Sequence, residues 1–448
     1  MKIAFISPAG AMHRYNGSFG KHLHYAPLTM PTLAALVPEK MKAELKIYDE
    51  TIEPVPLDLD ADIVAMTAIT GTSERVYRFA DYFRGRGITV LLGGVHPSLM
   101  PEEAARHADA VFTGIADRTF PQALYDFSNG CLKSRYDQSM FELSVANRPL
   151  ARRDLLKKRA YITANTMEAV RGCPHTCSFC AYPPAFGEKV LYRPVEEIID
   201  EIKTLRGKEV LFPDVNMISN MDYAKKLFRA MIPLKKYWFG LTTSAVTLDK
   251  ELMNVMQKSG CRGLLIGFES VSRKSQEFFD KKVNKPENYA LLVRQLHDIG
   301  VMVNGCFAFG GDEDDRDVFK RTVDAVQQMK IDLPRYSIAT PFPNTQLYRD
   351  LEAQGRIIEK NWAMYDVEHV VFRPKHMTVD ELYSGIEWAW NQTYGIDAIV
   401  KRLGVRPDFL MPFIYGANFA YRRFAEKFIN FSREKMCDNS DIPETVLA

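Results

Sequence analysis

The chain has 448 residues, of which 46% are hydrophobic and 25% are charged. This composition is typical of a globular protein with a large core, and it excludes the disordered and fibrous classes; the length predicts two or three domains. The 58 Lys and Arg residues nearly balance the 56 Asp and Glu residues, so the net charge of +2 argues against binding to nucleic acid.

The beginning of the chain predicts a strand. Residues 1–10 contain one Lys and a short apolar run, without the long apolar region of a signal peptide. Nowhere does the sequence hold the roughly 18 uninterrupted apolar residues of a membrane span, so we expect a cytoplasmic protein. A helix lying on a membrane surface is compatible with the sequence, which leaves peripheral membrane contact open.

Short apolar runs alternate with helix-like segments in residues 1–140. The predicted strands are residues 3–6, 45–48, 63–66, 90–92 and 111–112. Between them, Val76, Phe79, Ala80 and Phe83 recur at the spacing of one buried helix face, and Gly87 stands where a helix should stop. Strands that alternate with helices predict an α/β domain with a doubly wound parallel sheet, of the Rossmann-like type.

The segments that follow the predicted strands are candidate binding loops, because a doubly wound sheet binds ligands at the carboxyl ends of its strands. These segments are residues 67–72, 93–98 and 114–117. Their small residues would let a ligand approach the backbone closely. Gly and Thr are equally typical of tight strand-to-helix turns, so the pattern alone leaves both interpretations open.

Residues 141–160 break this rhythm and are interpreted as a linker. A second alternating series follows over residues 161–350, with strands predicted at residues 169–170, 210–212, 238–241, 264–268, 301–309 and 336–339. These six strand–helix units predict a partial (β/α)6 TIM barrel. The acidic run at residues 311–317 is interpreted as a solvated loop that opens a helix. Residues 351–448 place apolar residues such as Leu382 and Ile386 at helical spacing and predict a mainly helical C-terminal domain.

Three of the seven cysteines, Cys173, Cys177 and Cys180, are spaced Cys-x3-Cys-x2-Cys. Clustered thiols without a disulfide framework usually bind metal or perform chemistry. A structural zinc site or a self-contained iron–sulfur cluster uses four ligands, so three cysteines leave one coordination position open to a substrate. A zinc site completed by His175 would be strained, because that residue lies between the first two ligands.

This spacing, with Phe179 just before the last cysteine, resembles the radical S-adenosylmethionine superfamily. The whole chain resembles its cobalamin-binding class, nearest to the hopanoid methylases and the anaerobic magnesium-protoporphyrin monomethyl ester cyclase. The resemblance implies that Cys173, Cys177 and Cys180 hold a 4Fe-4S cluster, whose free iron binds the methionine moiety of S-adenosylmethionine. An external electron donor of flavodoxin or ferredoxin type would drive reductive cleavage to a 5′-deoxyadenosyl radical.

Other segments resemble cofactor-binding positions of that barrel. Residues 267–271 resemble the strand-end Gly-Phe-Glu-Ser segment, and residues 211–216 resemble a Phe-x-Asp-Asp-Asn run in which Val215 replaces the second acidic residue. Three further candidates are expected at the ends of neighbouring strands, namely Thr243, Ser244 and Asn304. Turn formation and helix capping are the alternative roles of these residues. The residues implied to bind S-adenosylmethionine are Phe179, Asp214, Asn216, Thr243, Ser244, Glu269 and Asn304.

The first domain resembles a cobalamin-binding domain. The residues that this implies as cobalamin contacts are Thr67, Thr70, Gly71, Gly93, Gly94, His96 and Gly114. The Asp-x-His-x-x-Gly motif that supplies a histidine ligand to cobalt is absent, since residues 13–17 lack its spacing and its aspartate. Cobalamin would therefore bind without a protein histidine on the metal, and His96 would contact its tail or stabilise the loop. Residues 114–117 also depart from the usual Gly-Glu-Gly-Glu.

The resemblance implies a cobalamin-dependent radical methyltransferase that acts on an unactivated carbon of a largely apolar small molecule. The alternatives are a radical cyclase, rearrangement or carbon–carbon bond-forming enzyme, with or without cobalamin, and a non-catalytic cobalamin or metal sensor. Several aromatic residues of the tail would line an apolar cavity or form ordinary core, namely Trp388, Trp390, Phe413, Tyr415, Phe419 and Tyr421. No residue is identified as a general acid or base.

Overall fold

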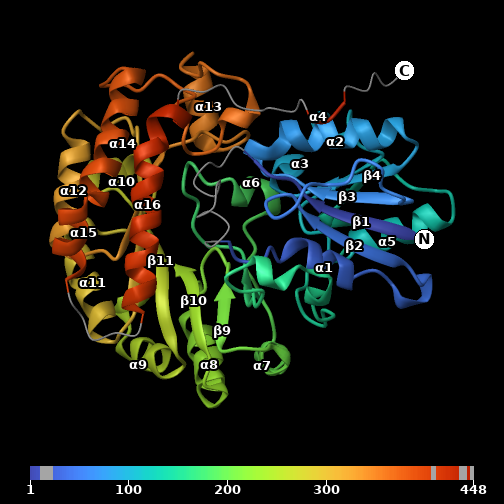
Figure 1. Ribbon diagram of the computed structural model, residues 1–448, viewed down its shortest axis with the longest axis horizontal. Helices are drawn as coiled ribbons and strands as arrows, with labels where there is room; N and C mark the ends of the chain where they lie inside the picture. Colours follow the sequence, from blue (N-terminus) through green and yellow to red (C-terminus); the bar gives the residue numbers. More distant parts are fainter. Residues whose placement is uncertain (11–23, 405–409, 433–440, 444–448) are drawn as a thin grey trace.

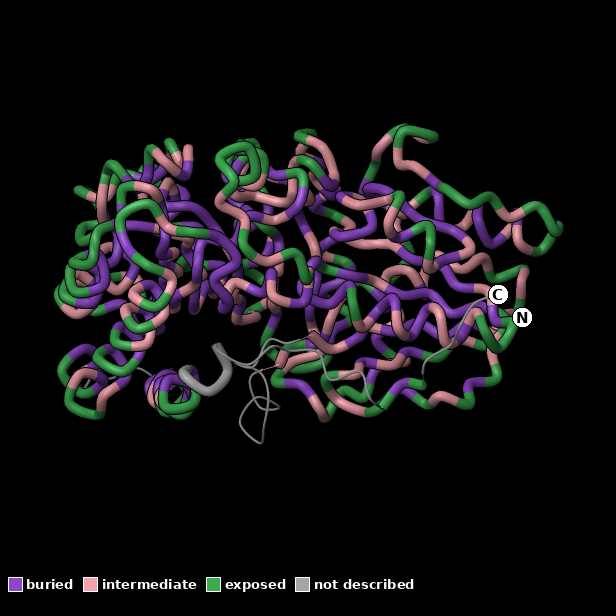
Figure 2. Tube along the Cα trace, turned by 90° about the horizontal axis from the view of Figure 1, so that it is seen from above, coloured by how far each residue is buried: buried purple, intermediate pink, exposed green. Residues whose placement is uncertain are grey.

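The computed structural model describes residues 1–10, 24–404, 410–432 and 441–443. Two parallel sheets lie next to each other, and a group of C-terminal helices covers the side of the second sheet that faces away from the first (Figure 1). Buried residues follow the interior of both halves, while exposed residues gather at the outer loops (Figure 2). Within the described residues, no helix has the length and apolar character that a membrane span requires.

The first sheet has six parallel strands in the order β2-β1-β3-β4-β5-β6. They are β1 (Lys2–Ser7), β2 (Glu44–Asp49), β3 (Ile63–Thr67), β4 (Thr89–Gly93), β5 (Ala110–Thr113) and β6 (Arg135–Asp137). The five predicted strands are confirmed, and β6 is an edge strand too short and too polar to stand out in the sequence. The strand order reverses at β1, which makes this the doubly wound sheet that was expected.

Helices cover both faces of this sheet. They are α1 (Thr29–Ala35), α2 (Ser73–Gly85), α3 (Val95–Leu99), α4 (Pro101–Ala104) and α5 (Thr119–Ser128). The pleat of β1 sends Ile3 and Phe5 to the face packed by α1 and α5, and Ala4 and Ile6 to the face packed by α2. The four apolar residues predicted to form one face of α2 are all buried, so this helix is confirmed.

The second sheet has five parallel strands in the order β13-β12-β11-β10-β9. They are β9 (Glu209–Phe212), β10 (Tyr237–Thr242), β11 (Cys261–Glu269), β12 (Met302–Phe309) and β13 (Leu333–Ile338). The helices of this part are α6 (Tyr182–Phe186), α7 (Val195–Thr204), α8 (Met221–Met231), α9 (Lys250–Lys258), α10 (Arg273–Phe278), α11 (Tyr289–Asp298) and α12 (Val318–Met329). Strand and helix alternate along the chain, as in the predicted partial barrel.

The first unit of this barrel differs from the expectation of six full strands. Instead of joining the parallel sheet, β7 (Val170–Arg171) pairs antiparallel with β8 (Leu191–Tyr192), and only Thr166 bridges β9 in parallel. The reason is Asp214, whose Oδ2 accepts hydrogen bonds from the N–H groups of Ala169 and Val170 at 3.0 and 2.9 Å. These donors are therefore not available to the sheet, and the sixth strand is reduced to a bridge.

The C-terminal region is mainly helical, as predicted, with α13 (Gln346–Ala353), α14 (Val379–Tyr394), α15 (Ile396–Leu403) and α16 (Met411–Ser432). Among its aromatic residues, Trp390 and Tyr421 are core, since their rings stack with centroids 5.7 Å apart. Trp388, Phe413 and Phe419 are 40%, 41% and 43% exposed. None of the six candidate aromatic residues lines the cavity between the two sheets, so the structure favours core and surface roles over a cavity wall.

The described residues near the end of the chain return to the first domain. Ile442 is 1% exposed and packs in the same core cluster as α2. Asp441 forms an ion pair with Arg75 of α2 at 2.8 Å, and Arg78 donates a hydrogen bond to the carbonyl of Ile442. Of residues 441–443, which the sequence places with the helical domain, Ile442 therefore contributes to the core of the first domain.

Candidate functional site

The three clustered cysteines lie on one loop that begins directly after β7. Gly172 opens this loop with a φ of +114°, and a Cβ at this position would lie 2.9 Å from the carbonyl oxygen of Lys189. Only glycine tolerates both conditions. Within the loop, the N–H of Cys180 donates to the carbonyl of Cys177 at 3.0 Å, which closes a turn. The backbone thus gathers the three thiols in one short segment.

The second half of the cysteine loop is fixed by contacts with the barrel. Ser178 donates its N–H to the carbonyl of Phe279 at 3.1 Å, and its own carbonyl accepts the N–H of Leu347 at 2.9 Å. The ring of Phe179 packs edge-on against Phe279, with centroids 5.5 Å apart. In the structure, Phe179 therefore anchors the loop on the end of α10, a role that the sequence did not suggest.

Burial disfavours the charged form of two of the clustered thiols. Burial raises the pKa of Cys177 to about 12, although the nearby Lys281 opposes this, and burial also raises the pKa of Cys180. Within the described part of the chain, no three Cys, His, Asp or Glu side chains converge closely enough to hold a single metal ion. A 4Fe-4S cluster does not require such convergence, because its cysteines bind different irons. The donor set thus fits this cluster.

A buried ion pair stands beside the cysteine loop, at the carboxyl end of β11. Lys281 donates to Glu269 Oε1 at 2.5 Å and to the carbonyl of Gly267 at 2.9 Å. Both side chains are nearly buried, with 11% and 12% exposed. Burial opposes the charge of Lys281, but Glu269 and the nearby thiol of Cys177 outweigh it, so the pKa of Lys281 is raised. The φ of Glu269, +58°, marks a strained backbone position of the kind that gathers at functional sites.

The sequence pattern indicates Glu269 but does not indicate Lys281. The lysine lies in the sequence Asp-Lys-Lys, where nothing in the pattern separates it from Lys282, whose side chain is 87% exposed. The path of the chain between α10 and α11 places the side chain of Lys281 inside the barrel and leaves that of Lys282 at the surface. The structure therefore adds the buried side chain of Lys281 to the residues that are predicted to bind S-adenosylmethionine.

Two further candidates, Asp214 and Asn216, follow β9 and lie beside the entrance to the cysteine loop. Asn216 Nδ2 is 3.9 Å from the sulfur of Cys173, which places this amide next to the first cysteine. Asp214 is 3% exposed, and its Oδ1 has no hydrogen-bond partner among the described residues. Burial raises the pKa of Asp214 well above its usual range, with the charge of Glu168 adding to the effect. Both residues support the loop, and Asp214 also faces the cavity described below.

The candidates on β10 and β12 are placed differently. Thr243 directly follows β10, and Ser244 donates to Asn284 Oδ1 at 2.9 Å, three residues beyond the buried Lys281. Asn304, in contrast, is the third residue of β12 and lies far from its carboxyl end, so the expected strand-end position is wrong. The predicted strand, residues 301–309, agrees with β12 to within one residue, so the error concerns the place of Asn304 within the strand. Because side chains alternate along a strand, Asn304 shares a face of the sheet with Cys306. Cys306 is close enough to Lys281 to contribute to the raised pKa of that lysine.

The acidic run after β12 is only partly the solvated loop that was expected. Asp315 is exposed and pairs with Arg321, but Asp314 is 1% exposed. Its Oδ2 accepts the N–H groups of Gly310 and Gly311, both at 3.0 Å, and Ser275 donates to its Oδ1 at 2.7 Å. Burial outweighs these hydrogen bonds and raises the pKa of Asp314 to about 6. The carboxyl group shapes the turn that follows β12.

Replacing Asp314 by asparagine is expected to flatten the pH dependence of stability. Because the pKa of Asp314 is raised to about 6 in the folded protein, folding favours the protonated form. This contribution is complete below about pH 4, the unfolded value, and is lost as the pH rises through 6. The wild type should therefore lose up to about 3 kcal/mol over this interval, and the variant should not. Urea unfolding from about pH 4 to 8 measures the free energy of unfolding of both proteins. The prediction is contradicted if this free energy depends on pH in the same way in the wild type and in the variant. The control is Asp315→Asn, which changes the neighbouring exposed residue.

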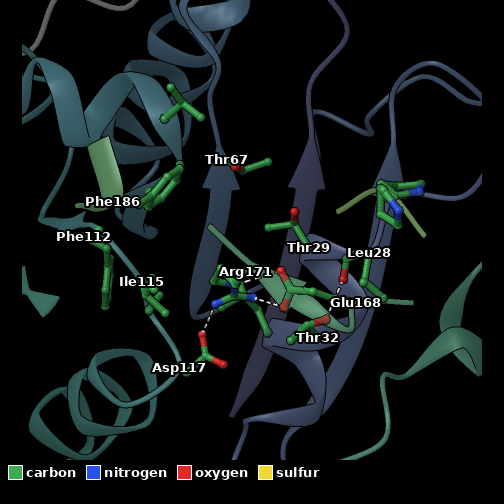
Figure 3. Close-up of a pocket in the computed structure, with 18 of the residues that line it drawn as sticks. Leu28, Thr29, Thr32, Thr67, Phe112, Ile115, Asp117, Glu168, Arg171 and Phe186 are labelled. Atoms are coloured by element: carbon green, nitrogen blue, oxygen red, sulfur yellow. Dashed lines mark hydrogen bonds and ion pairs between the residues drawn. The ribbon is translucent and has the colours of Figure 1, made fainter. Parts of the chain in front are cut away.

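A cavity of about 490 Å³ lies between the carboxyl edge of the first sheet and the barrel. Figure 3 shows Thr67 and Phe112 of the first sheet, Thr29 and Thr32 of α1, and Phe186 of α6 around it. Its wall continues through residues 168, 170–172 and 213–215, which lead into the cysteine loop or follow β9. The cavity is apolar over most of its wall and carries a few charged groups, as cofactor sites do. Its position at the strand ends and its glycine-lined edge fit a corrinoid.

Four of the seven predicted cobalamin contacts line this cavity, namely Thr67, Gly93, Gly94 and Gly114. Gly94 has a φ of +108°, and a Cβ there would lie 2.6 Å from Thr67 Oγ1. The conformation of the turn is thus sufficient to require glycine at position 94. The missing side chain also leaves the backbone of Gly94 accessible from the cavity. Thr70 and Gly71 do not line the cavity. They belong to a 3-10 turn that packs on residues 365–366, and a Cβ on Gly71 would lie 3.2 Å from the carbonyl of Tyr365.

His96 does not line the cavity either and is fully buried. Its Nε2 lies 3.1 Å from Glu103 Oε1, and Trp362 donates to the other oxygen of Glu103 at 3.0 Å. Burial alone would raise the pKa of Glu103, but His96 and Trp362 lower it to about 2. His96 therefore belongs to a contact between the first domain and the C-terminal region. Residues 13–17, which lack the histidine motif, lie outside the described residues.

Two parts of the chain match known protein families. Residues 167–326 match the Radical SAM superfamily, and residues 39–124 match the B12 binding domain. The first match begins just before the cysteine loop and ends within α12. The second runs from just before β2 into α5 and includes the loops of the first sheet that border the cavity. The two matches thus coincide with the two sides of the candidate site.

Over most of its length, the chain is also similar to individual proteins. It is 31% identical over 366 residues to bacteriochlorophyllide d C-8(2)-methyltransferase of Chlorobaculum tepidum, which covers 77% of this chain and 80% of that protein. It is 29% identical over 412 residues to bacteriochlorophyllide d C-12(1)-methyltransferase of the same organism, covering 90% and 89%. Hopanoid methylases and the anaerobic magnesium-protoporphyrin IX monomethyl ester cyclase are also among the similar proteins, as the resemblance implied.

The fold is shared with a solved structure. OxsB, a cobalamin-dependent S-adenosylmethionine radical enzyme with aqua-cobalamin and S-adenosylmethionine bound, superimposes with a TM-score of 0.68. The superposition covers 95% of this chain and 71% of that chain, at 14% sequence identity. The arrangement of the first sheet, the barrel and the helical region is therefore an established architecture, although the sequences have diverged widely.

Proposed function

The chain belongs to the cobalamin-binding class of the radical S-adenosylmethionine superfamily, and on this basis we propose that it methylates an unactivated carbon of a largely apolar substrate. It is an enzyme that uses a 4Fe-4S cluster, S-adenosylmethionine and cobalamin, together with a reductant and a small-molecule substrate. When bound, these cofactors supply radical hydrogen abstraction and methyl donation, which side chains alone do not provide. Family membership favours this enzyme over a zinc site or a non-catalytic sensor.

One observation supports methyl transfer between two cofactor sites more than any other. Residues 168 and 170–172, which lead into the cysteine loop, form part of the wall of the cavity at the carboxyl edge of the first sheet. The proposed cluster site and the proposed cobalamin site therefore share one segment of chain. A substrate held between them would reach both, as a reaction with two cofactors requires.

In this proposal, Cys173, Cys177 and Cys180 hold the cluster, and the residues beside them bind S-adenosylmethionine. Lys281 supplies a positive charge for the carboxylate of the methionine moiety, and Glu269 accepts hydrogen bonds from its amino group. The ion pair between Lys281 and Glu269 holds both side chains in place. Thr243, Ser244 and Asn216 border the same edge of the barrel. Asn304 lies further away, within the sheet, and Phe179, within the cysteine loop, packs against Phe279.

Cobalamin is proposed to lie in the cavity along Thr67, Gly93, Gly94 and Gly114. These loops present backbone groups and small side chains, which allow a large planar ligand to approach closely. The apolar wall around Phe112 excludes water from the space between the cofactors, which protects a reactive intermediate. His96 keeps a supporting role for the loop after β4.

An apolar substrate is supported by the names of the relatives. Methyltransferases of bacteriochlorophyllide d share 29% and 31% of their aligned residues with this chain, and hopanoid methylases are also related. These substrates are a macrocycle and triterpenoids, both with large apolar surfaces. A macrocycle or a polycyclic lipid is therefore the substrate class to be tested first. The electron donor is proposed to be of flavodoxin or ferredoxin type, while peripheral membrane contact and cytoplasmic location stay predictions.

Methyl-labelled S-adenosylmethionine tests the proposed reaction. Protein prepared without oxygen, with iron, sulfide and cobalamin supplied, is reduced and incubated with bacteriochlorophyllides and with hopanoid lipids. The label is expected in the product, together with one 5′-deoxyadenosine and one S-adenosylhomocysteine for each methyl group transferred. Release of 5′-deoxyadenosine with an altered but unlabelled product would replace the proposal by the alternative, a radical cyclase, rearrangement or carbon–carbon bond-forming enzyme.

A further inference from the structure

We propose that Asp117, Arg148, Glu168 and Arg171 form a positioning device that sets the cysteine loop at a fixed place relative to the cobalamin-binding domain. These four residues are called the charge ring below. They come from three separate segments, namely the loop after β5, the linker and the chain that enters the cysteine loop. The inference concerns how the two cofactor sites are held together and does not depend on whether a methyl group is transferred.

The charge ring is a closed cycle of alternating charges. Arg171 donates to both oxygens of Glu168, at 2.9 and 2.7 Å, and to Asp117 Oδ2 at 2.7 Å. Arg148 donates to Glu168 Oε2 at 2.5 Å and forms an ion pair with Asp117. Each carboxylate therefore faces both arginines. Figure 3 shows Arg171 between Glu168 and Asp117 at the edge of the cavity.

The charge ring is largely shielded from water. The exposed fractions of its side chains are 8% for Arg148, 11% for Asp117 and 20% for both Glu168 and Arg171. Burial opposes the charge of Glu168, but the two arginines outweigh it and lower the pKa of Glu168 to about 2. Two arginines thus face two acidic side chains, so the formal charges of the cycle balance. Such a cycle adds no net charge to the apolar cavity that three of its members line.

The location of the charge ring points to positioning more than to stability. Arg171 is two residues before Cys173, and Asp117 ends the loop that starts at Gly114 and borders the cavity. Buried ion pairs are poor contributors to stability but fix geometry, because the bidentate fork of an arginine accepts few orientations. From the barrel side, Asp214 holds the N–H groups of Ala169 and Val170. The entrance to the cysteine loop is thus fixed from both sides.

The chain offers a matched control in Arg153. This arginine lies in the same linker region, is 8% exposed, and pairs with Glu201 at 2.6 Å while donating to the carbonyl of Thr166. Its hydrogen-bond and ion-pair partners belong to the barrel side, and it does not line the cavity. Arg153→Met therefore removes a buried, paired arginine without cutting the link between the two cofactor sites.

Magnetic interaction between the two cofactors tests the inference. The holoenzyme is reduced so that cluster and cobalamin are both paramagnetic, and electron paramagnetic resonance measures how strongly the cluster speeds relaxation of the cobalamin spin. Arg171→Met is expected to lower this enhancement by about twofold or more, because a loop displaced by ~1 Å or more changes a steeply distance-dependent interaction. Arg153→Met should retain it. Arg171→Lys keeps the positive charge but lacks the two-pronged guanidinium. Its relaxation enhancement should lie between those of Arg171→Met and Arg153→Met.

Cofactor content separates positioning from loss of binding. Iron and cobalamin content of Arg171→Met should match those of Arg153→Met, since the charge ring is proposed to set distance and not occupancy. If Arg171→Met does not fold or load, Asp117→Asn removes the same link without a change in size, and the same loss of enhancement is expected. Unchanged enhancement in the charge-ring variants, or an equal loss in Arg153→Met, would overturn the inference. Methyl transfer is not used as a readout, so failure of the proposed function would not be mistaken for failure of this one.

Discussion

Replacing Cys177 by serine is expected to abolish the 4Fe-4S cluster and with it the cleavage of S-adenosylmethionine. The hydroxyl of serine is a poor ligand for iron compared with a thiolate, and the loop offers three cysteines only. Iron content after anaerobic reconstitution should fall from about four per chain to near zero. Release of 5′-deoxyadenosine after reduction should disappear in parallel.

The control for this experiment is Cys131→Ser. Cys131 is also a free cysteine, but it is exposed and follows α5 in the first domain. Its replacement should leave iron content and 5′-deoxyadenosine release unchanged. A Cys177→Ser protein that still binds a full cluster would show that the cluster ligands lie elsewhere. Loss of the cluster in Cys131→Ser would mean that the assay reports general damage by oxidation.

Replacing Lys281 by methionine is expected to reduce both stability and affinity for S-adenosylmethionine. The change leaves Glu269 buried without its partner, and breaking a buried pair in this way costs about 3 kcal/mol. The proposed contact with the cofactor carboxylate is lost as well. Because hydrogen bonds to charged groups are strong, affinity should fall by about tenfold or more. Urea unfolding measures the first effect, and equilibrium binding of S-adenosylmethionine measures the second.

Two further variants separate these effects. Lys282→Met changes the neighbouring exposed lysine and should alter neither stability nor affinity appreciably. The double variant Lys281→Met with Glu269→Gln removes both charges and should recover most of the lost stability, because no unpaired charge remains buried. It should not recover affinity. If the double variant binds S-adenosylmethionine as tightly as the wild type, Lys281 has a structural role only.

Much of the fold was predictable because its signals are local. Alternating apolar runs predicted five strands of the first sheet and five of the second, and helical spacing predicted α2. Spacing also located the cysteines, since three ligands on one loop need only eight residues. These features depend on neighbours along the chain, which a sequence displays directly.

The remaining features depend on contacts between distant segments. Asp214 lies 44 residues from Val170, whose N–H it accepts, so the reduced first barrel strand could not be read from residues 169–170. Lys281 was missed because its partner Glu269 precedes it by 12 residues across a helix. Pairings of this kind are decided by tertiary packing, which overrides local preference.

The return of residues 441–443 to the first domain has a consequence for biosynthesis. Domains usually fold in order as the chain emerges from the ribosome. Here the first domain lacks Ile442 from its core, and Arg75 lacks its ion pair with Asp441, until the barrel and the helical region have been made. The part of this core that Ile442 covers therefore stays uncovered through most of translation. Completion of the first domain is a late event, tied to the arrival of a segment that follows every other described element.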